Sequence, residues 1–354
     1  MATEDVRYAF IVEWFDPQAS LLKKYNLFFW PATNSIEMYD IKNRRTFLKR
    51  VEYPSVKLDS LFIGACVCVY SRQIKVVGFA DPFTAGQLRQ RLARTACLIK
   101  PSAQASLGPV IDSLIQNGFS LSRLLTVRLT DSLIKSIQPE GEQEAVTDPL
   151  VNGIGTALEL VAPDAVATLK SLCDKTPVLR MSLIAAESPA NYTQFMKTFF
   201  ERGLPPTAVM SDCTMAVIKP HAVRDGLAGK IISAIAERGF EITAAELFYL
   251  DRPAAEEFLE VYKTVIPQYS SLVENFTSGA SIAIQIHGGP DVVERFREVT
   301  GPHDPEIAKH VRPNTLRAVF GTDRINNGLH ATDIHEDGTL ESEFFFKILQ
   351  DAKA

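Results

Sequence analysis

The sequence predicts an α+β protein made of a small all-β module followed by two α/β sandwich domains that repeat one another. Three observations support this prediction. Residues 7–77 alternate between apolar and polar in the manner of half-buried strands. A motif near residue 95 recurs near residue 214, and in each copy apolar strands alternate with amphipathic helices. The chain has 354 residues, which is enough for two or three cores of ordinary size.

The overall charge and composition limit the partners of the chain. The formal net charge is -5 at pH 7, which argues against a general nucleic-acid binder because such proteins need a basic surface. The five cysteines lack the paired spacing of a zinc site, and a reducing compartment fits best. The N-terminus lacks the apolar segment of a secretory signal, and no stretch approaches ~18 consecutive apolar residues. We therefore expect a soluble, cytoplasmic protein that binds neither nucleic acid nor membrane.

The N-terminal module contains the clearest strand patterns. Strands are predicted at residues 7–15, 25–30 and 35–40. Both tryptophans of the chain, Trp14 and Trp30, fall in these strands, and we expect them to pack in a core or an interface. Cys66 and Cys68 lie two residues apart on one face of a further strand, and we expect them to be buried apolar side chains rather than metal ligands.

The module also carries a basic run. Five positive charges occur within nine residues of an otherwise acidic chain: Lys42, Arg44, Arg45, Lys49 and Arg50. One interpretation is a solvated strand and turn. The other is a docking patch for an acidic partner. The guanidinium groups of its arginines would make bidentate contacts with the partner's carboxylates. The sequence leaves both interpretations open.

The two sandwich domains are recognised as an internal duplication. Residues 95–103 (TACLIKPSA) recur as residues 214–222 (TMAVIKPHA), and residues 152–160 resemble residues 278–286. A period of about 120 residues is too long for a solenoid, so it indicates a repeated domain. A Gly/Pro segment at residues 203–206 suits a boundary. We predict domains at residues 1–91, 92–203 and 204–354.

The second copy shows its expected elements most clearly, and their order predicts a ferredoxin-like, split-βαβ sandwich. The elements expected there are a helix around Ile231, Ile232 and Ile235, a strand at 240–250, helices at 253–262 and 267–275, a strand at 281–287, a helix at 291–299, a long loop, and a strand at 316–320.

Functional residues concentrate in this second copy. All six histidines lie after residue 220, so imidazole chemistry is confined to the C-terminal part of the chain. A lysine ending a buried strand (Lys219), two arginines (Arg297 and Arg317), Asn327 and His330 are the residue types that phosphoryl transfer needs. The cations would hold phosphate oxygens, the amide would orient the sugar, and neutral imidazole would attack phosphorus. No Walker or kinase glycine-rich loop is present, so the phosphate site would be built from side chains.

Residues 214–349 resemble the nucleoside diphosphate kinase family. The resemblance rests on residues 218–220 (IKP), Arg297, residues 315–317 (TLR) and residues 327–333 (NGLHATD), in the family's order. It implies that His330 is the phosphohistidine nucleophile and that Glu341 orients its ring. It also implies nucleotide contacts by Lys219, Arg297, Arg317, Asn327, Thr332 and Asp333, with Mg²⁺ held by the phosphates of ATP, GTP or a diphosphate rather than by the protein.

The second copy departs from the family pattern at several positions. The resemblance places Leu259 where the family has a tyrosine, although Tyr262 lies one turn away. His303 replaces the threonine that contacts phosphate in the family. The phenylalanine on which the nucleobase stacks is lost at Gln268 or shifted to Tyr269. The loop over residues 305–312 is longer than in the housekeeping enzymes.

The first copy departs further. It retains Lys100, and Arg180 is a candidate for a second cation, but no histidine occurs in the first 220 residues. Residues 187–191 (ESPAN) stand where the strand with the asparagine and histidine is expected. We predict that this copy is a structural or weakly nucleotide-binding domain without transfer activity.

The whole chain resembles family members in which a DM-ten module, of the pleckstrin-homology-like type, precedes two kinase-like copies. Residues 13–17 (EWFDP), 45–50 (RTFLKR) and 61–64 (LFIG) carry that part of the resemblance. It implies a protein of the ciliary or flagellar axoneme, the basal body or the centrosome, with tubulin, microtubules and other axonemal or centrosomal proteins as partners. Two functions stay open: a phosphotransferase with one site at His330, or a structural component of the doublet microtubule without significant catalysis.

Overall fold

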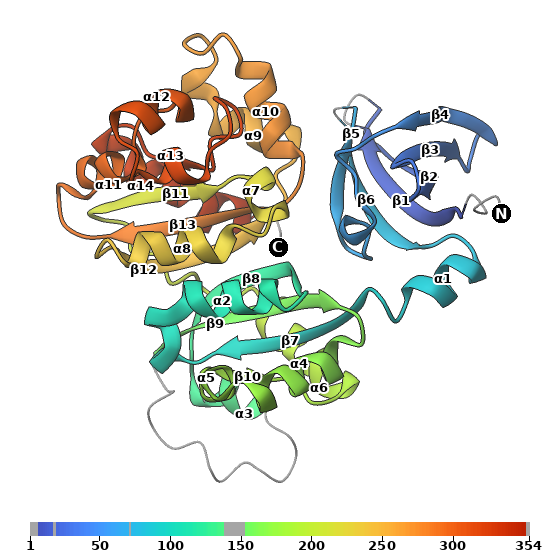
Figure 1. Cartoon of the computed structure of the whole chain (residues 1–354), viewed down its shortest axis with the longest axis horizontal. Coiled ribbons are helices and arrows are strands. Elements are labelled where there is room, and N and C mark those ends of the chain that lie inside the picture. The colour runs from blue at the N-terminus through green and yellow to red at the C-terminus, as the bar shows by residue number, and fades with distance from the viewer. Residues whose placement is uncertain (1–5, 17–18, 71, 138–152, 352–354) are drawn as a thin grey trace.

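The computed structural model describes residues 6–16, 19–70, 72–137 and 153–351. Residues 1–5, part of the segment in which we expected no secretory signal, lie outside the described residues. The chain forms three domains, with the N-terminal module beside the second copy and the first copy below both (Figure 1). Among the described residues, no helix is both long and apolar enough to cross a bilayer.

An antiparallel sheet of six strands forms the N-terminal module, in the order β4-β3-β2-β1-β6-β5. The strands are β1 (Tyr8–Asp16), β2 (Leu21–Trp30), β3 (Ser35–Asp40), β4 (Arg45–Glu52), β5 (Cys66–Val69) and β6 (Arg72–Phe79). Helix α1 (Pro82–Leu88) follows, and Asp81 begins it by accepting a hydrogen bond from the Thr84 backbone N–H at 2.6 Å. The three predicted strands are therefore confirmed, and their alternating inward residues form one core.

The tryptophans of the module pack as predicted. Trp30 is 9% exposed, and the guanidinium carbon of Arg50 lies 4.2 Å from the centre of its ring. Trp14 packs against the edge of the same core. The prediction for the cysteines is only partly right, because Cys66 and Cys68 are half-buried on β5, an edge strand of the sheet. Burial still raises the pKa of the Cys66 thiol to about 11.

Each sandwich domain has a four-stranded antiparallel half-sheet flanked by helices. The first copy contains β7 (Ala93–Ile99), α2 (Leu107–Gln116), β8 (Ser120–Arg128), α3 (Asp131–Ile137), β9 (Ile154–Ala162), α4 (Ala165–Lys175), α5 (Pro177–Ser182), β10 (Leu183–Ala185) and α6 (Pro189–Phe199). The second copy contains β11 (Cys213–Ile218), α7 (Pro220–Arg224), α8 (Ala228–Ala236), β12 (Glu241–Phe248), α9 (Arg252–Phe258), α10 (Tyr269–Thr277), β13 (Ser281–His287), α11 (Val292–Thr300), α12 (Pro305–Val311), α13 (Leu316–Phe320), β14 (Leu329–Ala331), α14 (His335–Glu343), a π-helical turn (Phe344–Ile348) and α15 (Leu349–Asp351).

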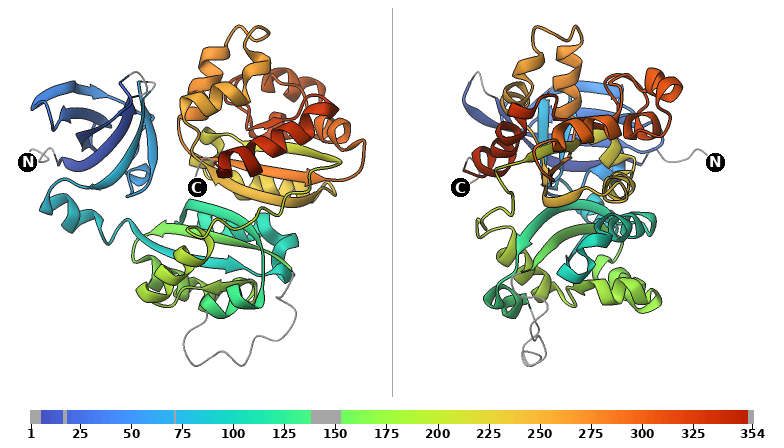
Figure 2. Two further views of the ribbon diagram at one scale, coloured as in Figure 1. Left: turned by 180° about the vertical axis from the view of Figure 1, so that it is seen from behind. Right: turned by 90° about the vertical axis from the view of Figure 1, so that its left-hand side faces the viewer.

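The two half-sheets join into one sheet of eight strands, in the order β10-β7-β9-β8-β12-β13-β11-β14. The joint is the pair β8 and β12, where Leu125 lies opposite Glu246. Helices α2 and α8 cover the same side of this joint, as Figures 1 and 2 show. Apolar residues from both copies form one continuous core under these helices. The two copies therefore share one sheet and one core.

Two glycines allow α2 and α8 to approach closely. A Cβ atom added to Gly108 would lie 2.3 Å from the backbone nitrogen of Ser233 on the facing helix. A Cβ atom added to Gly229 would lie 2.3 Å from the backbone nitrogen of Asp112. Real Cβ atoms do not approach backbone atoms so closely, so any larger residue at either position would push the helices apart.

Two predictions about the second copy are wrong. Residues 316–320 form helix α13 rather than a strand, because β14 pairs with β11 at that edge of the sheet. A short apolar run of this length does not distinguish helix from strand. The expected long loop contains α12, which begins at Asp304 with Pro305 in its first turn. The remaining predicted strands and helices of this copy lie within a few residues of their observed positions.

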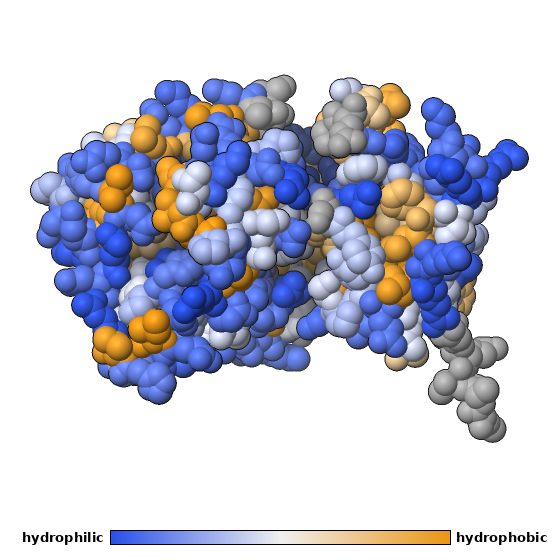
Figure 3. Space-filling view, turned by 90° about the horizontal axis from the view of Figure 1, so that it is seen from above, coloured by the Kyte–Doolittle hydropathy of each residue, from blue (hydrophilic) through white to orange (hydrophobic). Residues whose placement is uncertain are grey.

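The three domains meet around a cavity. Its volume is 640 Å³, and its walls include Tyr70 of the module, Phe119 of the first copy and Val223 of the second. Seen from above, the module and the second copy are separated by a furrow with hydrophobic and hydrophilic residues on its rims (Figure 3). The module also contacts the second copy directly, since the Gln73 amide donates a hydrogen bond to the Leu250 carbonyl at 2.7 Å.

Candidate active site

Strand pairing brings predicted site residues of the second copy to one place. Strand β11 is buried along its whole length and lies between β13 and β14. Val217 on β11 lies opposite His330 on β14, and Lys219 directly follows β11. The Lys219 backbone N–H donates a hydrogen bond to the Gly328 carbonyl at 3.0 Å. The predicted lysine and histidine, which are 111 positions apart in the numbering, therefore belong to one site.

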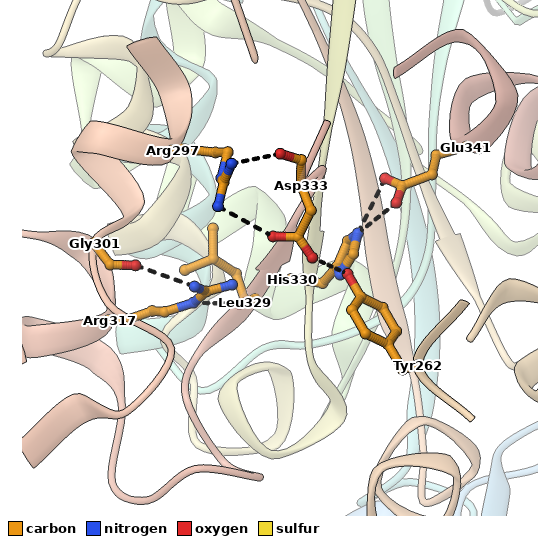
Figure 4. A network of polar contacts seen from close by, with 8 residues as sticks. All are labelled: Tyr262, Arg297, Gly301, Arg317, Leu329, His330, Asp333 and Glu341. Atoms are coloured by element: carbon orange, nitrogen blue, oxygen red, sulfur yellow. Dashed lines mark hydrogen bonds and ion pairs between the residues drawn. The ribbon is translucent and has the colours of Figure 1, made fainter. Parts of the chain in front are cut away.

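The His330 ring is oriented by Glu341. Its Nε2 lies 3.0 Å from each carboxylate oxygen of Glu341, which comes from helix α14 (Figure 4). The Thr332 hydroxyl donates a hydrogen bond to the same carboxylate at 2.8 Å. The edge of the imidazole also packs against Phe258, with the ring centres 4.9 Å apart. These contacts favour the tautomer with the proton on Nε2, which leaves the Nδ1 lone pair available as a nucleophile.

Two buried cations lie close to this histidine. Lys219 is 2% exposed and donates a hydrogen bond from Nζ to the Ile325 carbonyl at 2.9 Å. Arg317 is also buried and donates to the carbonyl oxygens of Gly301 and Leu329 at 3.1 and 3.4 Å (Figure 4). Burial, with the nearby charge of Arg317, lowers the pKa of Lys219 to about 7. Buried positive charge without a close carboxylate favours binding of an anion.

Asp333 connects the third predicted cation to a tyrosine. Arg297 donates to the Asp333 backbone carbonyl at 2.6 Å, and its other terminal nitrogen lies 3.8 Å from the carboxylate (Figure 4). The Tyr262 hydroxyl donates to the same carboxylate at 2.5 Å, and its ring centre lies 6.2 Å from that of His330. Tyr262 and Leu259 both line the cavity at this point. Helix α9 ends at Phe258, and the tighter turn that follows carries Tyr262.

These side chains line a cavity of 600 Å³. The predicted residues on its wall are Lys219, Arg297, His303, Arg317, Asn327, His330 and Asp333. Glu341 and Thr332 stand behind His330 and do not line it. Two buried atoms on the wall, Asn327 Oδ1 and Thr300 Oγ1, have no hydrogen-bond partner among the described residues. Because such atoms are costly to leave unpaired, they indicate that a polar ligand completes the site.

The sequence did not single out Thr300 and His221. Thr300 ends helix α11 beside Gly301, and no motif in the sequence marks it. His221 accepts a hydrogen bond from the Gly328 backbone N–H at 3.2 Å and so supports the turn that carries Asn327. Burial lowers the pKa of His221 to about 4, so its ring is a neutral acceptor. In the sequence, the signal that could have identified His221 was its position directly after residues 219 and 220.

The other residues that depart from the family pattern lie in different parts of the structure. His303 lies where the cavity meets a second, smaller hollow, and its backbone carbonyl accepts from the Asn327 amide at 3.0 Å. Burial and the charge of Arg317 lower the pKa of His303 to about 4. Gln268 lines the smaller hollow. Tyr269 instead donates to the Glu256 carbonyl at 3.3 Å and is not among the residues that line either hollow.

The first copy has no histidine at the position that corresponds to His330. Leu183 pairs with Ile99 as Leu329 pairs with Ile218, so Ile184 occupies the position of His330. Residues 187–191 follow that strand rather than forming it, so the residues that correspond to 327–330 are 181–184, and our alignment was wrong. Arg180 is exposed on α5, and Lys100 is half-buried. An aliphatic side chain at the nucleophile position excludes phosphohistidine there.

Comparisons with known proteins find relatives of the whole chain and of its second copy. A family model described as "Nucleoside diphosphate kinase 7 N-terminal PH domain" matches residues 2–90, and one described as "Nucleoside diphosphate kinase" matches residues 212–350. Nucleoside diphosphate kinase homolog 7 of Mus musculus is 39% identical over 370 residues, which span 97% of this chain and 93% of the relative. The nucleoside diphosphate kinase of Aquifex aeolicus is 38% identical over 137 residues, which span 39% of this chain and 95% of the relative. A solved structure of the Aquifex aeolicus enzyme covers 39% of this chain and 97% of its own, with 37% identity and a TM-score of 0.37.

Proposed function

Because this chain belongs to the nucleoside diphosphate kinase homolog 7 family, we propose that its second copy passes the γ-phosphoryl group of a nucleoside triphosphate to a nucleoside diphosphate through His330. One observation carries the proposal. The His330 ring is held at Nε2 by Glu341 and lines a cavity that also contains Lys219, Arg297 and Arg317. A fixed imidazole beside clustered cations is what transfer through a phosphohistidine requires.

The transfer has two half-reactions. In the first, Nδ1 of His330 attacks the γ-phosphorus, a phosphorus–nitrogen bond forms, and the bond to the β-phosphate oxygen breaks. In the second, a terminal oxygen of the incoming diphosphate attacks the same phosphorus, and the nitrogen bond breaks. The proton on Nε2 stays with the ring throughout, because Glu341 accepts its hydrogen bond. Lys219 and Arg317 stabilise the charge on the transferring group.

The cavity fits a nucleotide with its Mg²⁺ ion. Its cationic side chains match phosphate oxygens, and the unpartnered Asn327 Oδ1 matches a ribose hydroxyl. Mg²⁺ bound to the phosphates would neutralise part of their charge and so ease attack on phosphorus. Lys219 would be the residue most affected by binding, because the phosphates would favour its charged form.

Phosphorylation of the intact chain tests this proposal. Incubation with γ-labelled ATP and Mg²⁺ should give acid-labile label on the wild-type protein and none on His330→Ala. His335→Ala is the matched control, since His335 is exposed on α14, five residues along the chain. No residual label is expected from the first copy, because Ile184 takes the nucleophile position there. Label that persists in His330→Ala would contradict both assignments.

A second candidate function is docking to the cytoskeleton through the N-terminal module. It is favoured by the exposure of Lys42, Arg44, Arg45 and Lys49 on the β3–β4 hairpin, which lies on the side of the module away from the second copy (Figure 1). We propose an acidic partner such as tubulin, in a microtubule of the axoneme, the basal body or the centrosome. This function is compatible with phosphoryl transfer and also with a purely structural role in the doublet microtubule.

Microtubule co-sedimentation of the full-length protein tests the docking proposal. Arg44→Glu with Arg45→Glu should reduce the bound fraction severalfold at low salt, and wild-type binding should fall as salt rises, because exposed charges are screened over ~8 Å at physiological ionic strength. Lys170→Glu with Lys309→Glu is the control, since both lysines are exposed on the two copies. Binding that ignores the first pair, or that resists salt, would exclude docking through this hairpin.

A further inference from the structure

The second residue of helix α7, His221, is a buried histidine that the proposed transfer does not use. It is 5% exposed and is not among the residues that line the cavity, so it is not placed to receive a phosphoryl group. Its Nε2 accepts a hydrogen bond from the Gly328 backbone N–H at 3.2 Å. Its Nδ1 is buried and has no hydrogen-bond partner among the described residues. The contact with Gly328 is therefore the polar contact that this ring makes within the described part of the chain.

The unpaired Nδ1 shows that packing alone does not account for an imidazole at this position. In the tautomer that accepts at Nε2, the proton is on Nδ1, and a buried donor without an acceptor is costly. An aliphatic side chain would fill a similar space without this cost, but it would leave the Gly328 N–H unpaired. What His221 contributes is thus the acceptor at Nε2.

Both polar backbone groups of Gly328 are held by residues that flank Pro220. The N–H of Gly328 bonds to His221, and its carbonyl accepts from the Lys219 backbone N–H at 3.0 Å. The φ of Gly328 is +86°, in the left-handed region that favours glycine. Because glycine is also the most flexible residue, the backbone at this position depends on its two hydrogen bonds to keep one conformation.

The residues on either side of Gly328 belong to the candidate site. Before it, Asn327 donates from its amide to the His303 carbonyl at 3.0 Å and keeps its unpartnered oxygen on the cavity wall. After it, Leu329 begins β14, the strand that carries His330. A change in the backbone torsions of Gly328 would therefore move the Asn327 amide relative to His330.

We propose that His221 is a positioning residue for phosphoryl transfer, and that its Nε2 holds Gly328 in the conformation that presents the Asn327 oxygen to the nucleotide. The inference rests on the proposed transfer through His330, but the hydrogen bond can be tested without turnover. Loss of the bond should raise the KM for the nucleotide more than it lowers kcat, because β14 stays paired with β11 while the Asn327 amide loses its fixed position.

Two amide substitutions distinguish the two ring nitrogens of His221. The side-chain oxygen of glutamine can occupy the place of Nε2, whereas that of asparagine reaches only the place of Nδ1. In transfer from ATP to GDP by the full-length protein, His221→Asn and His221→Ala should raise the KM for GDP about tenfold and change kcat by roughly twofold or less. His221→Gln should restore a KM within about twofold of wild type. If His221→Ala fails to fold, the comparison of the two amides still decides.

Hydrogen exchange of the Gly328 amide provides a measurement that needs no catalysis. Exchange in the peptide that contains Gly328 should be faster in His221→Asn than in wild type or His221→Gln, because the N–H then lacks its acceptor. His287→Ala is the control, since His287 lies opposite Cys213 at the end of β11 away from the site. It should change neither the KM nor the exchange at Gly328.

Three results would decide against or limit the inference. Equal KM values for His221→Asn and His221→Gln would overturn the positioning role. A loss of stability in His221→Asn at an unchanged KM would also overturn it, because the bond would then serve the fold alone. Absence of transfer by the wild-type protein would remove the proposed function, and unchanged exchange at Gly328 in His221→Asn would separately show that His221 does not hold this turn.

Discussion

At the scale of single residues, the site depends on which charges are left uncompensated. Lys219 and Arg317 are buried beside backbone carbonyl oxygens rather than in close ion pairs, so a bound anion would compensate their charge. Asp333, by contrast, is shared by Arg297 and Tyr262. The two cations that would hold phosphate thus have no close carboxylate partner, whereas Arg297 is already paired with Asp333.

The pH dependence of the free energy of unfolding should reveal the lowered pKa of Lys219. Its pKa is about 7 in the folded chain and 10.5 when unperturbed, so between these values the unfolded chain binds more protons than the folded one. The contribution of Lys219 to stability should therefore increase as pH rises through this window, by up to ~1.4 kcal/mol per pH unit. Urea unfolding of wild type and Lys219→Met at pH 7.5 and 8.5 checks this. The stability of wild type relative to the variant should grow with pH, and an unchanged difference would contradict the assignment.

Nucleotide binding should also change the protonation of Lys219. Because phosphates favour the charged form of Lys219, binding above pH 7 should take up a proton. Calorimetric titration with ADP and Mg²⁺ in two buffers of different ionisation enthalpy measures this uptake. It should be present in wild type at pH 8 and reduced in Lys219→Arg, whose side chain stays protonated throughout. Equal proton uptake by the two proteins would show that another group titrates.

At the scale of helices and strands, the close contact of α2 and α8 is the most demanding feature. Gly229→Val should destabilise the chain by about 1–3 kcal/mol or more, because its side chain would meet the Asp112 backbone and force the helices apart. Gly86→Ala on α1 is the control, since a Cβ there meets nothing within 4 Å. That change should be neutral or slightly stabilising. Chemical denaturation of both variants separates these outcomes.

The sequence predicted elements best where pattern and length agree. Residues 281–287 were predicted as a strand and form β13 with the same limits. Residues 316–320 were assigned to the wrong class, because five apolar-rich residues satisfy either period and only the position of β14 decides. Helix α12 was missed although Asp304 and Pro305 are a good start signal, because its apolar residues are few.

The site shows the same division between motif and tertiary context. His330, Lys219 and Asn327 were found because short motifs fix their spacing, and all three line the cavity. Tyr262 was noted only as lying one turn from Leu259, and its bond to Asp333 could not be predicted because the break between α9 and the following turn has no marker in the sequence. Thr300 carried no motif at all, and only its place on the wall of the cavity identifies it.

At the scale of the whole molecule, two of the three domains share a core, in addition to the core that each of the two has to itself. The core between the sheet and helices α2 and α8 contains residues from both copies, whereas the core of the N-terminal module is separate. We therefore expect two principal unfolding transitions, one for the module and one for the paired copies. Both tryptophans lie in the module, so their fluorescence reports on that transition alone.

Core substitutions should distinguish the two transitions. Phe29→Ala in the module should cost about 3–5 kcal/mol and lower the transition seen by tryptophan fluorescence. Ile232→Ala on α8 should cost about 2–5 kcal/mol and lower only the transition of the paired copies in calorimetry. If Ile232→Ala left one copy unfolding at its original temperature, the two copies would be independent units and the shared core would not govern stability.

The pairing of β8 with β12 determines how the molecule behaves at low concentration. Two separate subunits that share a sheet in this way dissociate when their concentration falls, because the rate at which they meet again falls with concentration. Here one polypeptide supplies both halves, so the pairing of Leu125 with Glu246 persists at any concentration. The half with Ile184 at the nucleophile position can then serve as a permanent support for the half with His330. Such a molecule would function even where only a few copies are present.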